Sequence, residues 1–301
     1  MNITMEMNKY KFGLMVKKSI LPLCISLWFV SQNSYGQAAL PISVADPLQQ
    51  AEFSIKAIPG IPSGIRGMAV DENDVLYFSD TYSRLNDDSR IYTLDPPYTG
   101  EPSMTEISGQ SIAGLMWFKN RLYIAFLNKD EIEIYDENLE FLESRVIKSP
   151  LNFTTDGNNV YILTYYGSIG VISGNRVKTV VKGLSKASDI QYSGASTLYV
   201  TDHSLENGKG QIAEYANGGL QTGILLSDLA DPAGLEMDLS NNLYITDPCT
   251  NRVLMLTPGS ILSLVTDKFL NPHCLTKTSA GEILVSTDHE GGTLLVIKAV
   301  R

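Results

Sequence analysis

The stretch DPAGLEMDLSNNLYITDPCTNRVLML, residues 231–256, decides the fold of this chain. It holds three short apolar segments separated by turn residues, a pattern that predicts consecutive antiparallel strands. Its middle phrase, an apolar strand with an aromatic anchor, has copies centred on Tyr77, Tyr123, Tyr161, Tyr199, Tyr244 and, with leucine instead, Leu284. The steps between these anchors are 46, 38, 38, 45 and 40 residues, close to the length of a four-stranded propeller blade. We therefore predict an all-β protein, a six-bladed β-propeller with four-stranded antiparallel blades.

One further strand is expected before the first blade. Residues Glu52 to Ile58 alternate between apolar and polar, and we expect them to complete the last blade and so close the ring. The propeller then occupies residues 51–301, and residues 37–50 form a polar spacer. A repeat architecture accounts for the length of this chain as one domain, so we do not expect a second domain.

The first 36 residues have the features of a signal peptide. Lys9, Lys11, Lys17 and Lys18 precede an apolar run from Ile20 to Val30, and small residues follow at Ser34 and Gly36. We therefore expect an exported protein, periplasmic or secreted, with no stable membrane insertion after cleavage. An uncleaved anchor is the alternative, although the run is short for a membrane span. Lipidation at Cys24 is disfavoured because the bulky Leu23 precedes it.

Composition and charge restrict the class of partner. The chain is 44% hydrophobic and 19% charged, as expected for a folded globular protein. Its net charge is −10, and removal of the lysine-rich leader would make it more acidic. An acidic surface repels phosphate backbones, so we expect no nucleic-acid partner. The acidity serves either solubility or an acidic docking face.

Candidate site residues gather at one face of the predicted disc. Inner strands begin, and second strands end, on the same face because neighbouring strands of a blade are antiparallel. All three histidines of the chain map to this face. The ligand-binding candidates are Arg66, Asn152, Asp189, His203, His273 and His289. Arg66 and His273 are neighbours across the seam of the last and first blades, where they would serve as an anion clamp and a base, or else bond carbonyls at the rim.

Two cysteines remain after the predicted cleavage. Cys249 follows the second strand of the fifth blade, and Cys274 opens the inner strand of the sixth. Both therefore belong to one face of adjacent blades, in an exported protein, and we expect a disulfide between them. The alternative is a free Cys274 that acts beside His273.

Other repeated residues are interpreted as structural. Serine or threonine precedes an aspartate at the strand ends Asp80, Asp202, Asp247 and Asp288, where a carboxylate accepts backbone N–H groups of turns. Long connections at Tyr82–Ser89, Pro96–Pro102 and Ser204–Gly210 are either tolerated length or lids over a site. The sequence contains no glycine-rich phosphate loop, nucleophile elbow or paired-cysteine zinc motif.

Blade five resembles the NHL repeat, Pro-x-Gly-Ile-x-Val-Asp, a turn, Leu-Tyr-Val-x-Asp, then Asn-Arg-Ile. Blade one is similar in Arg66 to Asp71 and Leu76 to Asp80. The resemblance implies a propeller of the NHL or SMP-30 (regucalcin, gluconolactonase-like) type. That family's divalent metal is held by Glu, Asn and Asp at inner-strand starts, where this chain has Arg66, Ser188 and Ala233. We therefore expect no metal and no cofactor.

Two lyase families with this architecture were compared as well. Pro272-His273-Cys274-Leu275 resembles the Pro-His-Gly-Ile-like segment of streptogramin lyases, with cysteine in place of glycine. The three-histidine zinc site of the peptidyl-amidating lyases cannot be assembled from this sequence.

These observations predict recognition of a small molecule or protein partner at the channel mouth. A hydrolase or lyase that uses the same pocket is the alternative, and an assembly scaffold is a third class. Titratable groups within about 3 Å of one another at the mouth would favour catalysis. A channel lined by small and apolar residues would favour binding, and a flat apolar rim would favour a scaffold.

Overall fold

The computed structural model describes residues 42–44, 48–80, 88–174, 176–184, 186–194, 196–203, 209–216 and 219–300. The predicted signal peptide, with Cys24, lies outside these residues. So do most of the Tyr82–Ser89 and Ser204–Gly210 connections. Within the described ranges, no helix is both long enough and apolar enough to cross a membrane.

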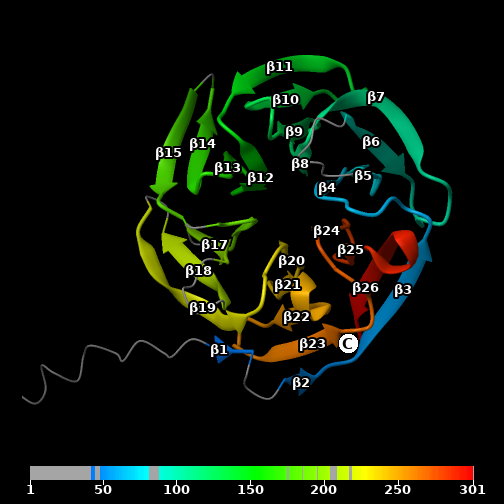
Figure 1. Cartoon of the computed structure of the whole chain (residues 1–301), viewed down its shortest axis with the longest axis vertical. Helices are drawn as coiled ribbons and strands as arrows, with labels where there is room; N and C mark the ends of the chain where they lie inside the picture. Colours follow the sequence, from blue (N-terminus) through cyan, green and yellow to red (C-terminus); the bar gives the residue numbers. More distant parts are fainter. Residues whose placement is uncertain are drawn as a thin grey trace, which may run out of the picture. The chain divides into compact units, whose positions relative to one another are not determined.

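Six sheets surround a central axis, and the four strands of each blade pair antiparallel (Figure 1). In blades one, four, five and six, the innermost strand is the shortest of the four. Blade one contains β4 (Met68–Val70), β5 (Leu76–Ser79), β6 (Asp88–Leu94) and β7 (Ser103–Gln110). Blade two contains β8 (Ile112–Trp117), β9 (Leu122–Phe126), β10 (Glu131–Tyr135) and β11 (Phe141–Val146). Blade three contains β12 (Pro150–Thr155), β13 (Val160–Thr164), β14 (Ser168–Ser173) and β15 (Arg176–Lys182).

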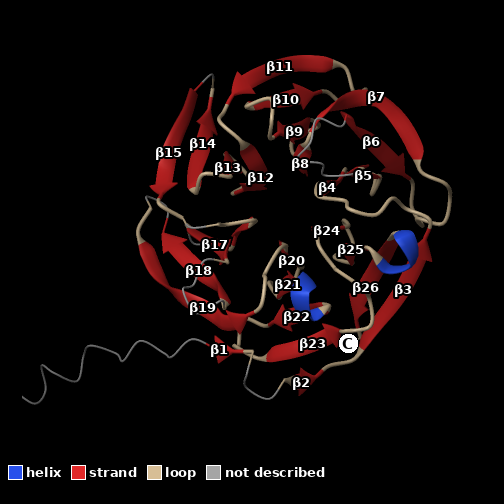
Figure 2. Ribbon diagram, in the orientation of Figure 1, coloured by secondary structure: helices blue, strands red, loops and turns tan. Residues whose placement is uncertain are grey.

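Blade four contains β16 (Ile190–Tyr192), β17 (Thr197–Asp202), β18 (Gly210–Ala216) and β19 (Gln221–Leu229). Blade five contains β20 (Leu235–Met237), β21 (Leu243–Asp247), β22 (Arg252–Leu256) and β23 (Leu262–Thr266). Blade six contains β24 (Leu275–Lys277), β25 (Ile283–Thr287), β26 (Thr293–Ala299) and β3 (Phe53–Pro59). The described helices are two single 3₁₀ turns, η1 (Pro248–Thr250) and η2 (His289–Gly291) (Figure 2). The six-bladed prediction is confirmed.

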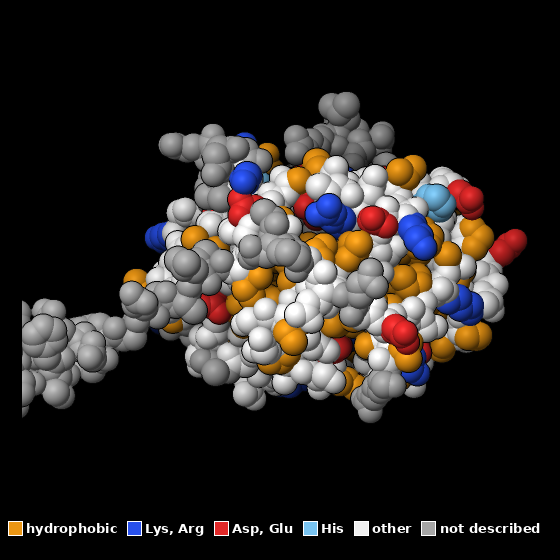
Figure 3. Space-filling model, turned by 90° about the horizontal axis from the view of Figure 1, so that it is seen from below, with side chains coloured by type: hydrophobic (Ala, Val, Ile, Leu, Met, Phe, Trp, Pro, Cys, Tyr) orange, Lys and Arg blue, Asp and Glu red, His pale blue; other side chains and the backbone are white. Residues whose placement is uncertain are grey.

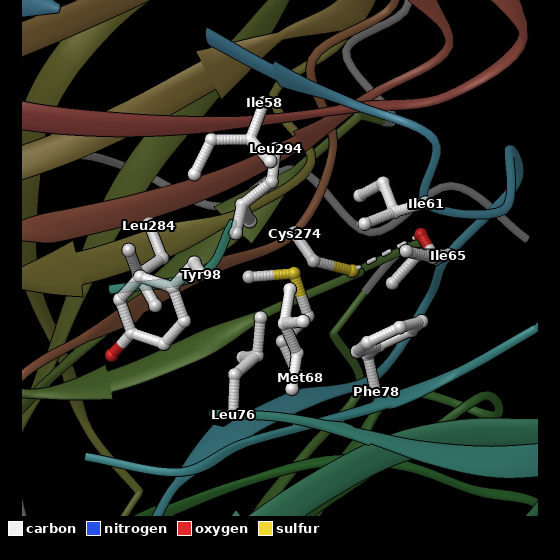
Figure 4. Close-up of a cluster of buried hydrophobic side chains, with 11 residues drawn as sticks. Ile58, Ile61, Ile65, Met68, Leu76, Phe78, Tyr98, Cys274, Leu284 and Leu294 are labelled. Atoms are coloured by element: carbon white, nitrogen blue, oxygen red, sulfur yellow. Dashed lines mark hydrogen bonds between the residues drawn. The ribbon is translucent and has the colours of Figure 1, made fainter. Parts of the chain in front are cut away.

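The ring closes as expected from the sequence. Strand β3 pairs antiparallel with β26, from Phe53 opposite Ala299 to Pro59 opposite Thr293. Ile58 of β3 is buried against Leu294 and Leu284 in the cluster between blades six and one (Figure 4). The first part of the chain therefore supplies the outer strand of the last blade.

Part of the expected spacer also forms strands. β1 (Ile42–Ser43) pairs parallel with β19, and β2 (Gln49–Gln50) pairs parallel with β23. Ile42, Val44 and Leu48 pack against the core cluster of blades four and five. Apolar burial holds this segment, and its two-residue strands are too short to produce a recognisable pattern.

In blades one, five and six, a hydroxyl near the end of the second strand binds the start of the inner strand of the same blade. It lies directly before the aspartate in blades one and five and two residues before it in blade six. The amides of Gly67, Gly234 and Cys274 donate to the hydroxyl oxygens of Ser79, Thr246 and Ser286 at 3.2, 2.8 and 3.1 Å. A hydroxyl at this position satisfies a buried backbone donor, which explains the conserved spacing of the phrase within the chain.

The strand-end aspartates accept backbone N–H groups, as expected. Asp247 accepts from Ala230 and Asp231 at 3.0 and 2.9 Å, and Asp288 accepts from Gly64 at 2.8 Å. These donors belong to the connections between blades rather than to the turn that follows the strand. Asp247 and Asp288 therefore hold neighbouring blades together. Asp80 instead accepts from the amide of Arg90 in its own blade at 2.6 Å, and Asp202 accepts from the side-chain amide of Gln211 in its own blade at 3.2 Å.

Inner strands approach one another too closely for a side chain at some positions. A Cβ atom at Gly114 would lie 2.2 Å from the carbonyl oxygen of Leu151, and one at Gly234 would lie 2.4 Å from that of His273. Where the sequence has Asn152, Asp189 or Cys274 instead, the side chain bonds a neighbouring blade or connection.

The Pro96–Pro102 connection lies away from the starts of the inner strands. It joins β6 to β7, and the hydroxyl of Tyr98 donates to the carbonyl of Asp74, in the turn between β4 and β5, at 2.8 Å. Pro96, Pro97 and Tyr98 line a separate cavity of about 390 Å³ with Lys56 and Glu282. This connection is therefore not a lid over the predicted mouth.

Candidate functional site

A cavity of about 960 Å³ runs along the axis of the propeller and is lined by residues of all six blades. The inner strands and the connections before them form its wall. Trp117, Glu236 and Lys277 lie toward the ends of the inner strands, and Lys277 forms an ion pair with Glu236 at 2.8 Å. Polar and titratable side chains gather where the inner strands begin, at the mouth. They are Arg66, Ser188, His203, Asp231 and His273.

Five of the six predicted site residues line this cavity: Arg66, Asn152, Asp189, His203 and His273. His289 does not, because it lies in η2 and its ring packs edge-on against Phe269 at a centroid distance of 5.3 Å. Of the three histidines predicted at this face, only His203 and His273 therefore line the cavity.

Asn152 and Asp189 are bound to each other and to the wall of the cavity. The carboxylate of Asp189 accepts bonds from the side-chain amide of Asn152 and from the backbone amides of Ile190 and Leu235, both at 2.7 Å. Burial raises the pKa of Asp189 to about 8, although the two backbone donors act in the opposite direction. This carboxylate joins blades three, four and five.

His273 supplies a neutral imidazole to the mouth. Burial lowers its pKa well below the usual value, and the positive charges of Arg66 and His203 act in the same direction. Its main chain is fixed, since its amide donates to Ser286 and its carbonyl accepts from the Thr246 hydroxyl at 2.9 and 2.7 Å. Within the described part of the chain, the one contact of the ring is 3.9 Å between Nδ1 and the sulfur of Cys274. Nε2 is left for a ligand.

Asp231, His203 and Ser188 form a continuous chain of side chains at the same mouth. Nδ1 of His203 forms a very short bond with Oδ1 of Asp231, and Nε2 lies 2.9 Å from Oγ of Ser188. The side chain of His203 is 17% exposed and that of Asp231 is 45% exposed. Three titratable or polar groups therefore meet within hydrogen-bond distance beside the cavity.

The sequence analysis did not select Ser188 or Asp231 as site residues. Ser188 occupies the same inner-strand start as Arg66 and His273, so its position carried the signal. Asp231 lies two residues before the corresponding residue Ala233, in the connection that enters blade five. The signal in the sequence was that both residues lie, like His203, at the mouth end of blades four and five.

The predicted disulfide is wrong, because Cys249 and Cys274 are both free thiols. Cys274 is buried, and its sulfur points to the Ile65 carbonyl at 3.3 Å, on the side of blade one (Figure 4). Cys249 is exposed and contacts Asp231 at 3.6 Å, in blade five. Burial raises the pKa of Cys274 to about 12, so this thiol is also unsuited to act as a nucleophile beside His273.

No group of three or more His, Cys, Asp or Glu side chains in the described ranges is arranged to hold a metal ion. At the inner-strand starts Ser188 hydrogen-bonds the carbonyl of Ala233 at 2.9 Å. Of the three positions that hold oxygen ligands in the regucalcin family, two are Arg66 and Ala233 in this chain, and the third is Ser188, whose hydroxyl already bonds the backbone.

The fold and this mouth define a six-bladed β-propeller with a polar axial cavity. The sequence matches no family model and no curated protein. Its structure is similar to luciferin-regenerating enzyme, with a TM-score of 0.64 and 13% identity over 83% of this chain and 96% of that one. It is also similar to virginiamycin B lyase from Staphylococcus aureus, with a TM-score of 0.57 and 10% identity over 83% of this chain and 100% of that one. The WD40 propeller domain of Doa1 is similar as well, with a TM-score of 0.59 and 9% identity over 84% of this chain and 98% of that one. At these identities the likeness establishes the fold.

Proposed function

We propose that this protein is an exported enzyme, a hydrolase or lyase, that binds a small anionic organic molecule at the mouth of its axial cavity. The observation that carries the proposal is that His273 and Arg66 both line the mouth of a cavity of about 960 Å³. Burial, and then the charges of Arg66 and His203, lower the pKa of His273 well below its usual value and favour the neutral imidazole. A neutral imidazole accepts a proton, and a guanidinium binds a carboxylate or phosphate in two-point geometry. Together they provide a base and an anchor for an acidic substrate.

The environment of His273 suits it to general-base catalysis. Because its pKa lies well below the usual value, the ring stays unprotonated at neutral pH and Nε2 is available. A water molecule held against it would attack a carbonyl carbon in a hydrolase. A C–H group next to a carbonyl would lose its proton to the same nitrogen in a lyase.

The comparisons and the repeat sequence support the proposal in part. Two lyases and a regenerating enzyme are among the similar structures, and one is described as a catalytically inactive histidine-to-alanine variant of virginiamycin B lyase with quinupristin. Blades one and five further support assignment to the NHL or SMP-30 type. The lysine-rich leader supports export.

Ligand or partner recognition without turnover is the second candidate. Ala113, Leu151 and Ala233 line the same mouth and offer apolar contacts to a bound molecule. The side of the propeller seen in Figure 3 has acidic and basic side chains interspersed and so does not offer an acidic docking face for a protein partner.

N,O-diacetylserine tests the proposal and separates its two reaction classes. It carries a carboxylate for Arg66, and hydrolysis yields N-acetylserine and acetate whereas elimination yields 2-acetamidoacrylate and acetate. We expect turnover to one of these products. We expect His273→Gln to lower kcat by about 10²-fold or more, and Arg66→Met to raise KM. His289→Gln, outside the cavity, is the matched control and should be unchanged.

The same experiment separates an enzyme from a binding protein. A saturable rise in melting temperature with N,O-diacetylserine, without product, would favour recognition alone. Turnover that survives His273→Gln in a folded variant would refute the role of His273. The absence of both turnover and a melting shift with this compound would contradict an anionic ligand site at the mouth.

A further inference from the structure

We propose that Ser188, His203 and Asp231 form a proton-donating chain that protonates the leaving group of the substrate. The proposal rests on the proposed enzymatic function and adds a substrate class to it. An alkoxide leaves poorly unless it receives a proton, so the substrate we infer is an alkyl ester that also bears a carboxylate or phosphate. His273 then acts as base, and this chain acts as the matching acid.

Hydrogen-bond geometry indicates where the protons of the chain lie. Oγ of Ser188 lies 2.9 Å from the carbonyl oxygen of Ala233 and 3.1 Å from that of Pro232. A carbonyl only accepts, and a hydroxyl has a single proton, so Ser188 donates that proton to one of the two carbonyls.

Oγ of Ser188 also lies 2.8 Å from Oγ1 of Thr201, which itself accepts from the backbone amides of Ser188 and Asp189 at 2.9 and 2.8 Å. With both of its lone pairs engaged, the Thr201 hydroxyl donates to Ser188. The remaining lone pair of Ser188 faces Nε2 of His203 at 2.9 Å and accepts from it.

The other ring nitrogen of His203 faces a carboxylate. Nδ1 forms its very short bond with Asp231, and an ionised carboxylate accepts only. In the proposed chain the ring of His203 carries both protons, with Nδ1–H directed at Asp231 and Nε2–H directed at Ser188. The chain thus stores a proton one hydroxyl away from the cavity.

The same neighbours argue against Ser188 as a nucleophile. Removal of its proton would leave an alkoxide within 3.1 Å of the carbonyl oxygens of Pro232 and Ala233. Two carbonyl dipoles with their negative ends toward an alkoxide destabilise it, whereas a hydroxyl that donates and accepts is well placed to pass a proton on. Ser188 is therefore assigned as a proton donor.

The fold does not require this polar chain. At the places that Ser188 and His203 occupy in blade four, blade two has Ala113 and Leu127, both buried. The Asp231–His203 pair is also partly exposed at the mouth, where ion pairs add little stability. A pair that contributes little to stability and borders the cavity is suited to a role in chemistry.

The proposed step balances as ester hydrolysis. Nε2 of His273 takes a proton from water as the water oxygen bonds to the ester carbonyl carbon. The bond between that carbon and the alkoxy oxygen then breaks, and the leaving oxygen takes the proton of Ser188. In the same step Nε2 of His203 passes its proton to Ser188, so that no alkoxide forms at Ser188. Exchange with solvent then deprotonates His273 and reprotonates His203. Ester and water give acid and alcohol.

Two esters of one acid test the chain. Monomethyl glutarate releases an alkoxide that needs a proton, whereas mono(4-nitrophenyl) glutarate releases a phenolate that does not. We expect Asp231→Asn and Ser188→Ala to lower kcat for the methyl ester at least about tenfold. We expect them to change kcat for the nitrophenyl ester less than about threefold. A merely structural defect would lower both rates together.

The controls keep the outcomes distinct. His289→Gln should leave both rates unchanged, and melting curves identify a variant that fails to fold. Ser188→Ala loses the bonds to blade five, so Asp231→Asn carries the test if Ser188→Ala unfolds. Equal losses for both esters, or no loss for either, would overturn the chain while leaving the enzyme intact. Failure of the wild-type protein to cleave either ester would overturn the enzymatic function and the chain with it.

Discussion

The partly buried imidazole of His273 makes the stability of the propeller depend on pH in a direction that can be worked out. In the folded protein, burial first, and then Arg66 and His203, hold the pKa of His273 well below the usual histidine value. In the unfolded chain it titrates near 6.5. Below that pH the unfolded state binds a proton that the folded state does not bind, so the free energy of unfolding falls as the pH falls.

The magnitude follows from proton linkage. The loss between pH 7 and pH 5 is at most about 2 kcal/mol, the limit reached when only the unfolded chain binds the proton over this range. His273→Gln removes the titrating group but keeps a polar side chain of similar size. Its stability should therefore fall less than that of the wild-type protein over this range, by up to about 2 kcal/mol.

Urea unfolding of the wild-type protein and His273→Gln at pH 7, 6 and 5 measures this difference. Other titrating groups, including Asp189, whose raised pKa acts in the opposite direction, contribute to both proteins and cancel. His289→Gln is the control and should follow the wild-type curve more closely than His273→Gln does. Parallel pH dependences for wild type and His273→Gln would refute a neutral imidazole at the mouth.

Three further predictions concern closure, thiols and export. Ile58→Ala should cost about 2–4 kcal/mol of unfolding free energy, because Ile58 is 7% exposed in the cluster that closes the ring. Ser54→Ala, at an exposed position of the same strand, should cost under about 0.5 kcal/mol, and equal effects would contradict the closure role of β3. Alkylation of the unfolded, unreduced protein followed by peptide mass spectrometry should find Cys249 and Cys274 both modified, and a linked peptide pair would contradict this. Mass spectrometry of the exported form should find a chain that begins between residues 37 and 40, and an intact leader would rule out cleavage.

The architecture was predictable because a propeller blade is a local unit. Strand alternation, the turn at Asn241-Asn242 and the hydroxyl–aspartate phrase at Thr246-Asp247 act within one blade or at its junction with the next, and the sequence repeats them. The closing strand was predictable for the same reason, since β3 has the alternation of any outer strand. The outer strands β1 and β2 were missed because burial against blades four and five, rather than a local pattern, holds them.

The candidate site was predictable only at the level of a face. The repeat placed Arg66 and His273 at one seam, but it did not indicate which side chains turn into the cavity. That depends on packing between blades: Asn152 and Asp189 bond each other in the wall, and Cys274 turns to the carbonyl of Ile65. Strand-end side chains take their directions from the neighbouring blade, which lies some 40 residues away in sequence.

The chain of Ser188, His203 and Asp231 has the same origin. Its members come from the start of one inner strand, the end of the second strand of that blade and the connection into the next blade. Strand periodicity places each of them at the mouth, but only the closed ring brings their side chains within hydrogen-bond distance. Local sequence therefore specifies the blades, whereas the contacts between blades decide the chemistry, because side chains from different blades meet only when the ring is assembled.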